Sequence, residues 1–133
     1  MIYQVKTPIL GFEQTETVKF EKIDDMTAKI TDTKNPEISF MLINPYALRE
    51  YSFDVPTPVQ VLLEMDQNSK INVYNILVLQ KPLEKSLVNF LAPLLFNEDN
   101  GTMGQAVLSG KEYPNFGVSV EIENFIKKEE LVS

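Results

Sequence analysis

The chain has 133 residues, 44% of them hydrophobic and 10% aromatic, which is the composition of one globular domain and argues against a disordered segment. It contains neither cysteine nor histidine, which excludes disulfides, Cys/His zinc sites and catalytic pairs that need a thiol or an imidazole. Nineteen acidic and twelve basic residues give a formal charge of −7, which disfavours direct binding to nucleic acid and favours a basic partner.

The sequence has no secretory signal at Met1–Lys6, where a basic region followed by an apolar stretch would be needed. No apolar run approaches the roughly 20 residues of a membrane-spanning helix. We therefore expect a cytoplasmic protein with no membrane partner.

The first predicted strands lie in the N-terminal third. Val18–Ile23 is a strand candidate whose apolar spacing leaves its inward face undefined. Met26–Thr33 and Glu37–Ile43 alternate apolar and polar side chains, which predicts strands with one buried face. Because Thr33–Pro36 consists of turn-forming residues, we expect these two strands to form a hairpin.

One short helix has a recognisable start. Thr57 is the expected N-cap, Pro58 the first helical residue and Gln60 the partner in a capping box. The pattern predicts a helix that ends near Asp66.

Several strands are predicted in the second half of the chain. Val73–Gln80 is apolar almost throughout, which predicts a central strand buried on both faces. Asn100-Gly101 predicts a tight hairpin turn, and the glycosylation pattern completed by Thr102 is better explained by that turn. The further strand candidates are Ser86–Leu91, Pro93–Asn97 and Met103–Leu108.

The C-terminal segment 118–133 is a candidate helical tail, because Ile122, Phe125 and Ile126 share one face of a helix. Together the elements predict a mostly β fold: a small antiparallel β-barrel-like single domain over residues 1–133, with one or two short helices.

Carboxylates are the only plentiful reactive groups, so a carboxylate-pair enzyme is the fair catalytic hypothesis. The candidate pairs are Asp24-Asp25 and Glu98-Asp99. Adjacent carboxylates point to opposite faces of a strand, or lie in solvent on a turn, so neither pair indicates a catalytic site. We predict no catalytic residue, no metal ligand and no cofactor.

An aromatic group near Arg49 allows two interpretations. Tyr46, Tyr51 and Phe53 could stack on RNA bases, or they could pack in the core. Core packing is favoured, because few basic residues surround them. Composition and periodicity thus favour a protein-binding domain over an enzyme.

Three segments carry a specific resemblance: Asn89–Asn97 (NFLAPLLFN), Met103–Leu108 (MGQAVL) and Glu112–Pro114 (EYP). In order, spacing and identity they resemble the FliW flagellar assembly factor family, and most of all its short form in Campylobacter and Helicobacter relatives. Looser similarity extends over nearly the whole chain, from Pro8–Glu13 onward.

The resemblance implies a cytoplasmic, β-barrel-like protein without enzymatic activity. FliW proteins bind the translational repressor CsrA and also flagellin, and thereby couple flagellin synthesis to export. The alternative for this chain is a dedicated flagellin chaperone with little CsrA binding.

The candidate partner-binding residues lie in the segment that carries the resemblance. They could meet a basic edge of CsrA, or they could be recognisable only because they shape a strand crossover. These residues are Asn89, Asn97, Glu98, Asp99, Gln105 and Tyr113.

Overall fold

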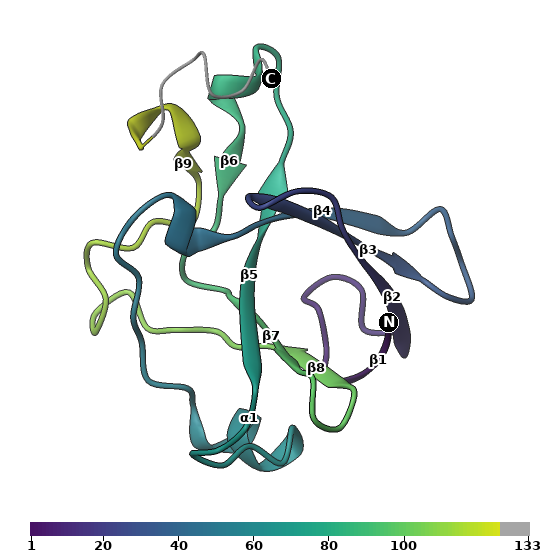
Figure 1. The fold of residues 1–133 in the computed structure, drawn as a ribbon. Helices are drawn as coiled ribbons and strands as arrows, with labels where there is room; N and C mark the ends of the chain where they lie inside the picture. Colours follow the sequence, from purple (N-terminus) through teal and green to yellow (C-terminus); the bar gives the residue numbers. More distant parts are fainter. Residues whose placement is uncertain (126–133) are drawn as a thin grey trace.

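The computed structural model describes residues 1–125 and shows mostly strands with a few short helical segments (Figure 1). In chain order the elements are β1 (Ile2–Thr7), β2 (Thr17–Lys22), β3 (Thr27–Asp32), β4 (Ser39–Ile43), the 3-10 helix η1 (Pro45–Ala47), α1 (Thr57–Leu62), β5 (Ile71–Val78), η2 (Leu83–Lys85), β6 (Leu87–Val88), β7 (Leu94–Asn97), β8 (Thr102–Gln105), β9 (Val120–Glu121) and η3 (Ile122–Asn124).

Seven of these strands close a barrel. The order is β4-β3-β2-β1-β8-β7-β5, and β5 pairs back with β4 to complete the ring. Neighbouring strands are antiparallel except β1 and β8, which are parallel. Beyond Ile76 the strand β5 leaves the ring and pairs with β6, which in turn pairs with β9. The mostly β, barrel-like fold predicted from the sequence is confirmed.

Both predicted hairpins are present. β3 and β4 pair with Ile30 opposite Phe40, and the turn between them is the predicted one. In the β7–β8 turn Gly101 has a φ of +68°, a conformation that glycine adopts without steric cost. Its N–H donates to the carbonyl of Asn97 at 3.0 Å.

The barrel interior holds the first hydrophobic cluster. Its aromatic centre is Tyr3, which meets Phe96 edge to face with ring centroids 5.1 Å apart, and Phe20 meets Phe96 at the same separation. Around them the buried members of the cluster are Ile9, Val18, Ala28, Ile30, Leu42, Leu94 and Met103. Strand alternation therefore delivers one face of each barrel strand to a common core.

The helix differs from its prediction at both ends. Pro56 occupies the N-cap position, and Thr57 is already helical, so its hydroxyl makes no capping hydrogen bond. Gln60 donates from Nε2 to the carbonyl of Val55 at 2.7 Å, in place of the expected capping box. The helix ends at Leu62, because the chain turns at Glu64 with a φ of +52°. The predicted capping box and the end near Asp66 are wrong.

The central strand is correctly placed in the sequence but is not buried on both faces. It pairs with β4, β6 and β7, which makes it the junction of the sheet. However, only Asn75 and Leu77 are buried within it, and Val78 is 52% exposed. The end of β5 extends past the barrel, beyond its last pair with β4 at Ile76.

The sequence patterns missed or overextended several strands. β1 and β9 were not predicted. The strand predicted over Ser86–Leu91 is only two residues long, and the one predicted to reach Leu108 ends at Gln105. In the candidate helical tail, residues 118–125 form β9 and one 3-10 turn in place of an α-helix, and residues 126–133 lie outside the described part.

Within residues 1–125, no helix is both long enough and apolar enough to cross a bilayer.

Candidate functional site

Three predicted site residues lie together at the β7–β8 turn. Asn97 is buried, with its Nδ2 donating to the carbonyl of Leu63 at 2.9 Å and its Oδ1 accepting from the N–H of Asp99 at 3.0 Å. Its side chain thus joins the turn to the loop that follows α1. This is a structural contact, since both ends of the amide are engaged inside the protein.

The two carboxylates of this turn also have partners. Glu98 forms an ion pair with Lys70 (Oε2–Nζ, 2.9 Å) and accepts from Nδ2 of Asn72 at 2.6 Å. The lysine contact, more than the asparagine contact, lowers the pKa of Glu98 below its usual value. Asp99 accepts from the backbone N–H of Lys70 at 2.9 Å. A partner that meets these carboxylates must therefore compete with Lys70.

The other three predicted residues lie elsewhere. Gln105 is buried, accepts from the N–H of Leu10 at 2.9 Å and donates to the carbonyl of Ala92 at 3.3 Å. Asn89 closes a local turn by accepting from the N–H of Leu91 at 2.9 Å. Tyr113 accepts from the N–H of Asp54 at 2.8 Å through its hydroxyl. The structure thus does not gather all six residues into one surface, and their role in partner binding stays a prediction.

A second region has a different character: the seam where β4 and β5 close the barrel. These strands pair only through Leu42–Ile76 and Ile43–Asn75, whereas β3 and β4 pair through five residue pairs. The next residues on the two strands, Met41 and Leu77, line an open cavity of about 430 Å³. The barrel therefore opens into a cleft where its two closing strands part, which we call the seam cleft.

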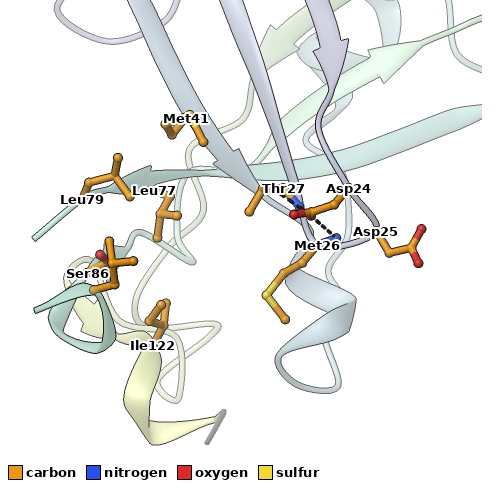
Figure 2. A pocket seen from close by; sticks show the side chains of 10 residues that line it. Asp24, Asp25, Met26, Thr27, Met41, Leu77, Leu79, Ser86 and Ile122 are labelled. Carbon is orange, nitrogen blue, oxygen red and sulfur yellow. Dashed lines mark hydrogen bonds between the residues drawn. The ribbon is translucent and has the colours of Figure 1, made fainter. Parts of the chain in front are cut away.

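The walls of the seam cleft are largely apolar (Figure 2). Leu77, Ser86 and Ile122 are buried and form its floor, whereas Leu79 and Leu83 are 52% and 47% exposed. The complete lining is Asp24, Asp25, Met26, Thr27, Met41, Leu77, Leu79, Leu83, Ser86 and Ile122. The sequence analysis missed this site, because its lining comes from several distant segments. The one available signal was the apolar run that continues past the end of β5.

Two aspartates stand at the edge of the seam cleft. Asp24 accepts from the N–H groups of Thr27 (2.7 Å) and Met26 (2.8 Å), and these bonds, Thr27 first, lower its pKa. Asp25 is exposed and lies 3.8 Å from Nζ of Lys22. Figure 2 shows its carboxylate directed away from the leucines. Asp24 closes a turn by accepting these bonds, whereas Asp25, the next residue, pairs with Lys22. The two carboxylates therefore do not converge on a common point.

The aromatic group near Arg49 packs against Phe90 and Phe116. Arg49 stacks over the rings of Phe116 (5.0 Å) and Phe90 (5.4 Å), and Tyr51 donates to the carbonyl of Phe90 at 2.6 Å. Burial raises the pKa of Tyr51 to about 12. Core packing is confirmed for Tyr51, whereas Tyr46 is 55% exposed.

Asn75 lies at the base of the same group. Its Nδ2 donates to the carbonyl of Asn89 at 2.8 Å and approaches the hydroxyl of Tyr51 at 3.3 Å. Its Oδ1 is buried and has no hydrogen-bond partner among the described residues. The side chain of Asn75 therefore links β5 to the loop after β6, while its Oδ1 is left without a hydrogen bond.

Within residues 1–125, no group of three or more acidic side chains is arranged to hold a metal ion. The two acidic pairs lie on turns and are occupied by the contacts described above. Among the described residues, the seam cleft combines largely apolar walls with two aspartates at its edge.

Comparison with known proteins agrees with the resemblance seen in the sequence. The family described as FliW protein matches residues 1–116. The chain is 48% identical over 128 residues to "Flagellar assembly factor FliW 1" of Wolinella succinogenes, which covers 96% of this chain and 100% of that protein. It is 48% identical over 131 residues to "Flagellar assembly factor FliW" of Helicobacter pylori strain G27, covering 97% of each.

A solved structure shows the same fold. A crystal structure of the flagellar assembly factor FliW superposes with a TM-score of 0.83 at 20% identity, over 96% of this chain and 87% of that one. The expected similarity to Helicobacter relatives is confirmed by the curated proteins above. The chain belongs to the FliW family of flagellar assembly factors.

Proposed function

We propose that this chain is a non-enzymatic cytoplasmic regulator of flagellar assembly that binds and antagonises the translational repressor CsrA and also binds flagellin. The observation that carries the proposal is membership of the FliW family over most of the chain, with near-complete coverage by relatives named as flagellar assembly factors. In this role flagellin export frees the chain to capture CsrA, and accumulated flagellin occupies it again.

The surface chemistry supports action by protein binding. A net charge of −7 speeds encounter with a basic partner, and carboxylates at an interface contribute more to steering and selectivity than to affinity. Exposed leucines beside the seam cleft add apolar area that becomes favourable only when a partner covers it.

The first experiment is a pull-down of purified CsrA by this chain, with and without excess flagellin, at two salt concentrations. The expected result is a complex with CsrA that flagellin displaces and that high salt weakens. Binding to flagellin without binding to CsrA would leave the dedicated chaperone, and binding to neither would refute the proposal.

The β7–β8 turn can be tested by reversing its charges. Glu98→Lys with Asp99→Lys should weaken CsrA binding at low salt about twofold to thirtyfold, since each of two exposed ion pairs contributes roughly 0.2–1 kcal/mol. The measurement is a titration at two salt concentrations, with a thermal unfolding curve to confirm that the variant folds.

A matched control reverses two charges on other loops. Glu16→Lys with Glu37→Lys changes the net charge equally, and Glu16 lies in a lysine ion pair of similar length, 2.8 Å to Lys34. Equal loss of CsrA affinity in both variants would mean that overall charge matters and the turn does not. Unchanged affinity in the turn variant would remove Glu98 and Asp99 from the interface.

A further inference from the structure

We propose that the seam cleft binds an extended protein segment, which adds as a strand to the open edge of β4 and carries apolar side chains beside a lysine or arginine. The inference rests on the proposed function, because it names a surface through which the chain would hold a protein partner. It places that surface away from the β7–β8 turn.

The first argument is the unpaired edge of β4. Five residues of this strand, Ser39–Ile43, pair with β3, but only Leu42 and Ile43 pair with β5. On the β5 side, the segment Ser39–Met41 has no strand partner within residues 1–125. Such an edge presents backbone N–H and C=O groups that a further strand can pair with.

The second argument is the cleft beside that edge. Successive side chains of a strand point to opposite faces, so an added strand would send every second side chain toward the cavity. The walls there are adaptable, because Met26 and Met41 are half-buried, unbranched and polarizable. Leu79 and Leu83 are about half exposed and would lose water contact when the segment binds.

The third argument is charge. Two carboxylates, Asp24 and Asp25, line the cleft, and no lysine or arginine is among its lining residues. A cationic residue in the bound segment would meet this surplus of negative charge, which an acidic segment could not.

A small polar ligand fits the cleft less well. The hydroxyl of Ser86 accepts from the N–H of Gln80 at 3.0 Å, and the hydroxyl of Thr27 donates to Asp24 at 2.9 Å. The polar groups of the lining are thus used within the protein, and few remain to orient such a ligand.

The test selects displayed random twelve-residue peptides on the intact protein. We expect enriched peptides to alternate apolar residues and to contain lysine or arginine. They should bind Leu79→Glu with Leu83→Glu at least tenfold more weakly than the wild type. Val61→Glu is the matched control, because Val61 is 68% exposed and lies on α1. This variant should bind the enriched peptides as tightly as the wild type does.

Failure to enrich any peptide, or equal binding to the leucine variant and the wild type, would overturn the inference. Thermal unfolding of each variant shows that lost binding does not reflect lost structure. Replacing Asp25 with lysine should weaken the enriched peptides severalfold, and an unchanged affinity would remove the charge argument.

Hydrogen exchange tests the strand addition itself. Saturating peptide should slow amide exchange at Ser39–Met41, while Val18 and Lys19 of β2, which pair with strands on both sides, should be unaffected. Peptide binding without protection of Ser39–Met41 would show that the segment does not bind as a strand.

The same leucine variant separates this inference from the proposed function. Full-length CsrA and flagellin that bind the variant as they bind the wild type would refute the seam cleft as their site and leave the function intact. Peptides that require the leucines, combined with no binding of CsrA or flagellin to the wild type, would support the cleft and refute the function.

Discussion

The β7–β8 turn and the seam cleft differ in how far their side chains are engaged within the protein. In the turn, three donors converge on the carbonyl of Leu63: Asn97 and Asn100 at 2.9 Å and Thr102 at 3.4 Å. In the cleft, Leu79 and Leu83 are half exposed and touch an open cavity. The recognisable sequence motif thus marks a structural joint, whereas unused apolar surface lies where the sequence carries no short motif.

The largest expected effect falls on the hairpin that contains the turn. In Gly104→Ala the added Cβ would collide with Oγ1 of Thr7 and lie 3.1 Å from its backbone N, across the β1–β8 pairing. Overpacking of this kind should lower the free energy of unfolding by about 3 kcal/mol, measured by urea denaturation. Gly110→Ala is the control, since its nearest neighbour would be Leu91 Cδ1 at 3.7 Å, an ordinary contact.

The next effect concerns the buried amide of the turn. Asn97→Ala leaves the N–H of Asp99 without its acceptor and removes one donor from Leu63, which should cost about 2 kcal/mol. Urea denaturation measures this, with the exposed Asn68→Ala as control. Peptides selected on the seam cleft should bind the variant normally, and a parallel loss of binding would mean that the two regions are coupled.

A smaller, pH-dependent effect is expected at the edge of the cleft. The pKa of Asp24 is lowered in the folded state, so its contribution to stability is present above the ordinary aspartate value of about 3.9 and is lost as pH falls through the lower folded value. Asp24→Asn should therefore reduce the loss of stability on acidification. Urea midpoints from neutral pH to about pH 3 measure this, and Asp25→Asn controls for the removal of one charge.

The smallest stability effect is expected at the leucines of the cleft. Leu79→Ser and Leu83→Ser should each change the free energy of unfolding by no more than about 0.5 kcal/mol, because both side chains are half exposed. Thermal unfolding provides the measurement. A large destabilisation would show that these leucines contribute to the stability of the fold, as the side chains of the turn do.

The parts of the fold that could be predicted are local. The β3–β4 and β7–β8 hairpins follow from alternation and turn residues within a few positions of one another. β1 was missed because Ile2 is apolar but exposed, which breaks the alternation, and because its pairing with β8 joins distant segments. β9 has only two residues and depends on β6 for its existence.

The candidate site was harder to predict for the same reason. Apolar residues that continue to Leu79 indicate burial, yet the strand projects past the barrel and half exposes them. The cleft exists because β4 and β5 separate after two residue pairs. The point at which two strands separate cannot be predicted from the alternation of apolar and polar residues in either strand.

The parallel pairing of β1 with β8 sets when the barrel can form during synthesis. Gln4 pairs with Thr102, and Val5 pairs with Met103, so the ring lacks β8 until the chain as far as Gln105 has left the ribosome. Contacts this distant in sequence also slow folding after release. A nascent chain therefore carries β1 with one edge unpaired for most of its translation, and ribosome-bound factors that shield strand edges would influence the yield of folded protein.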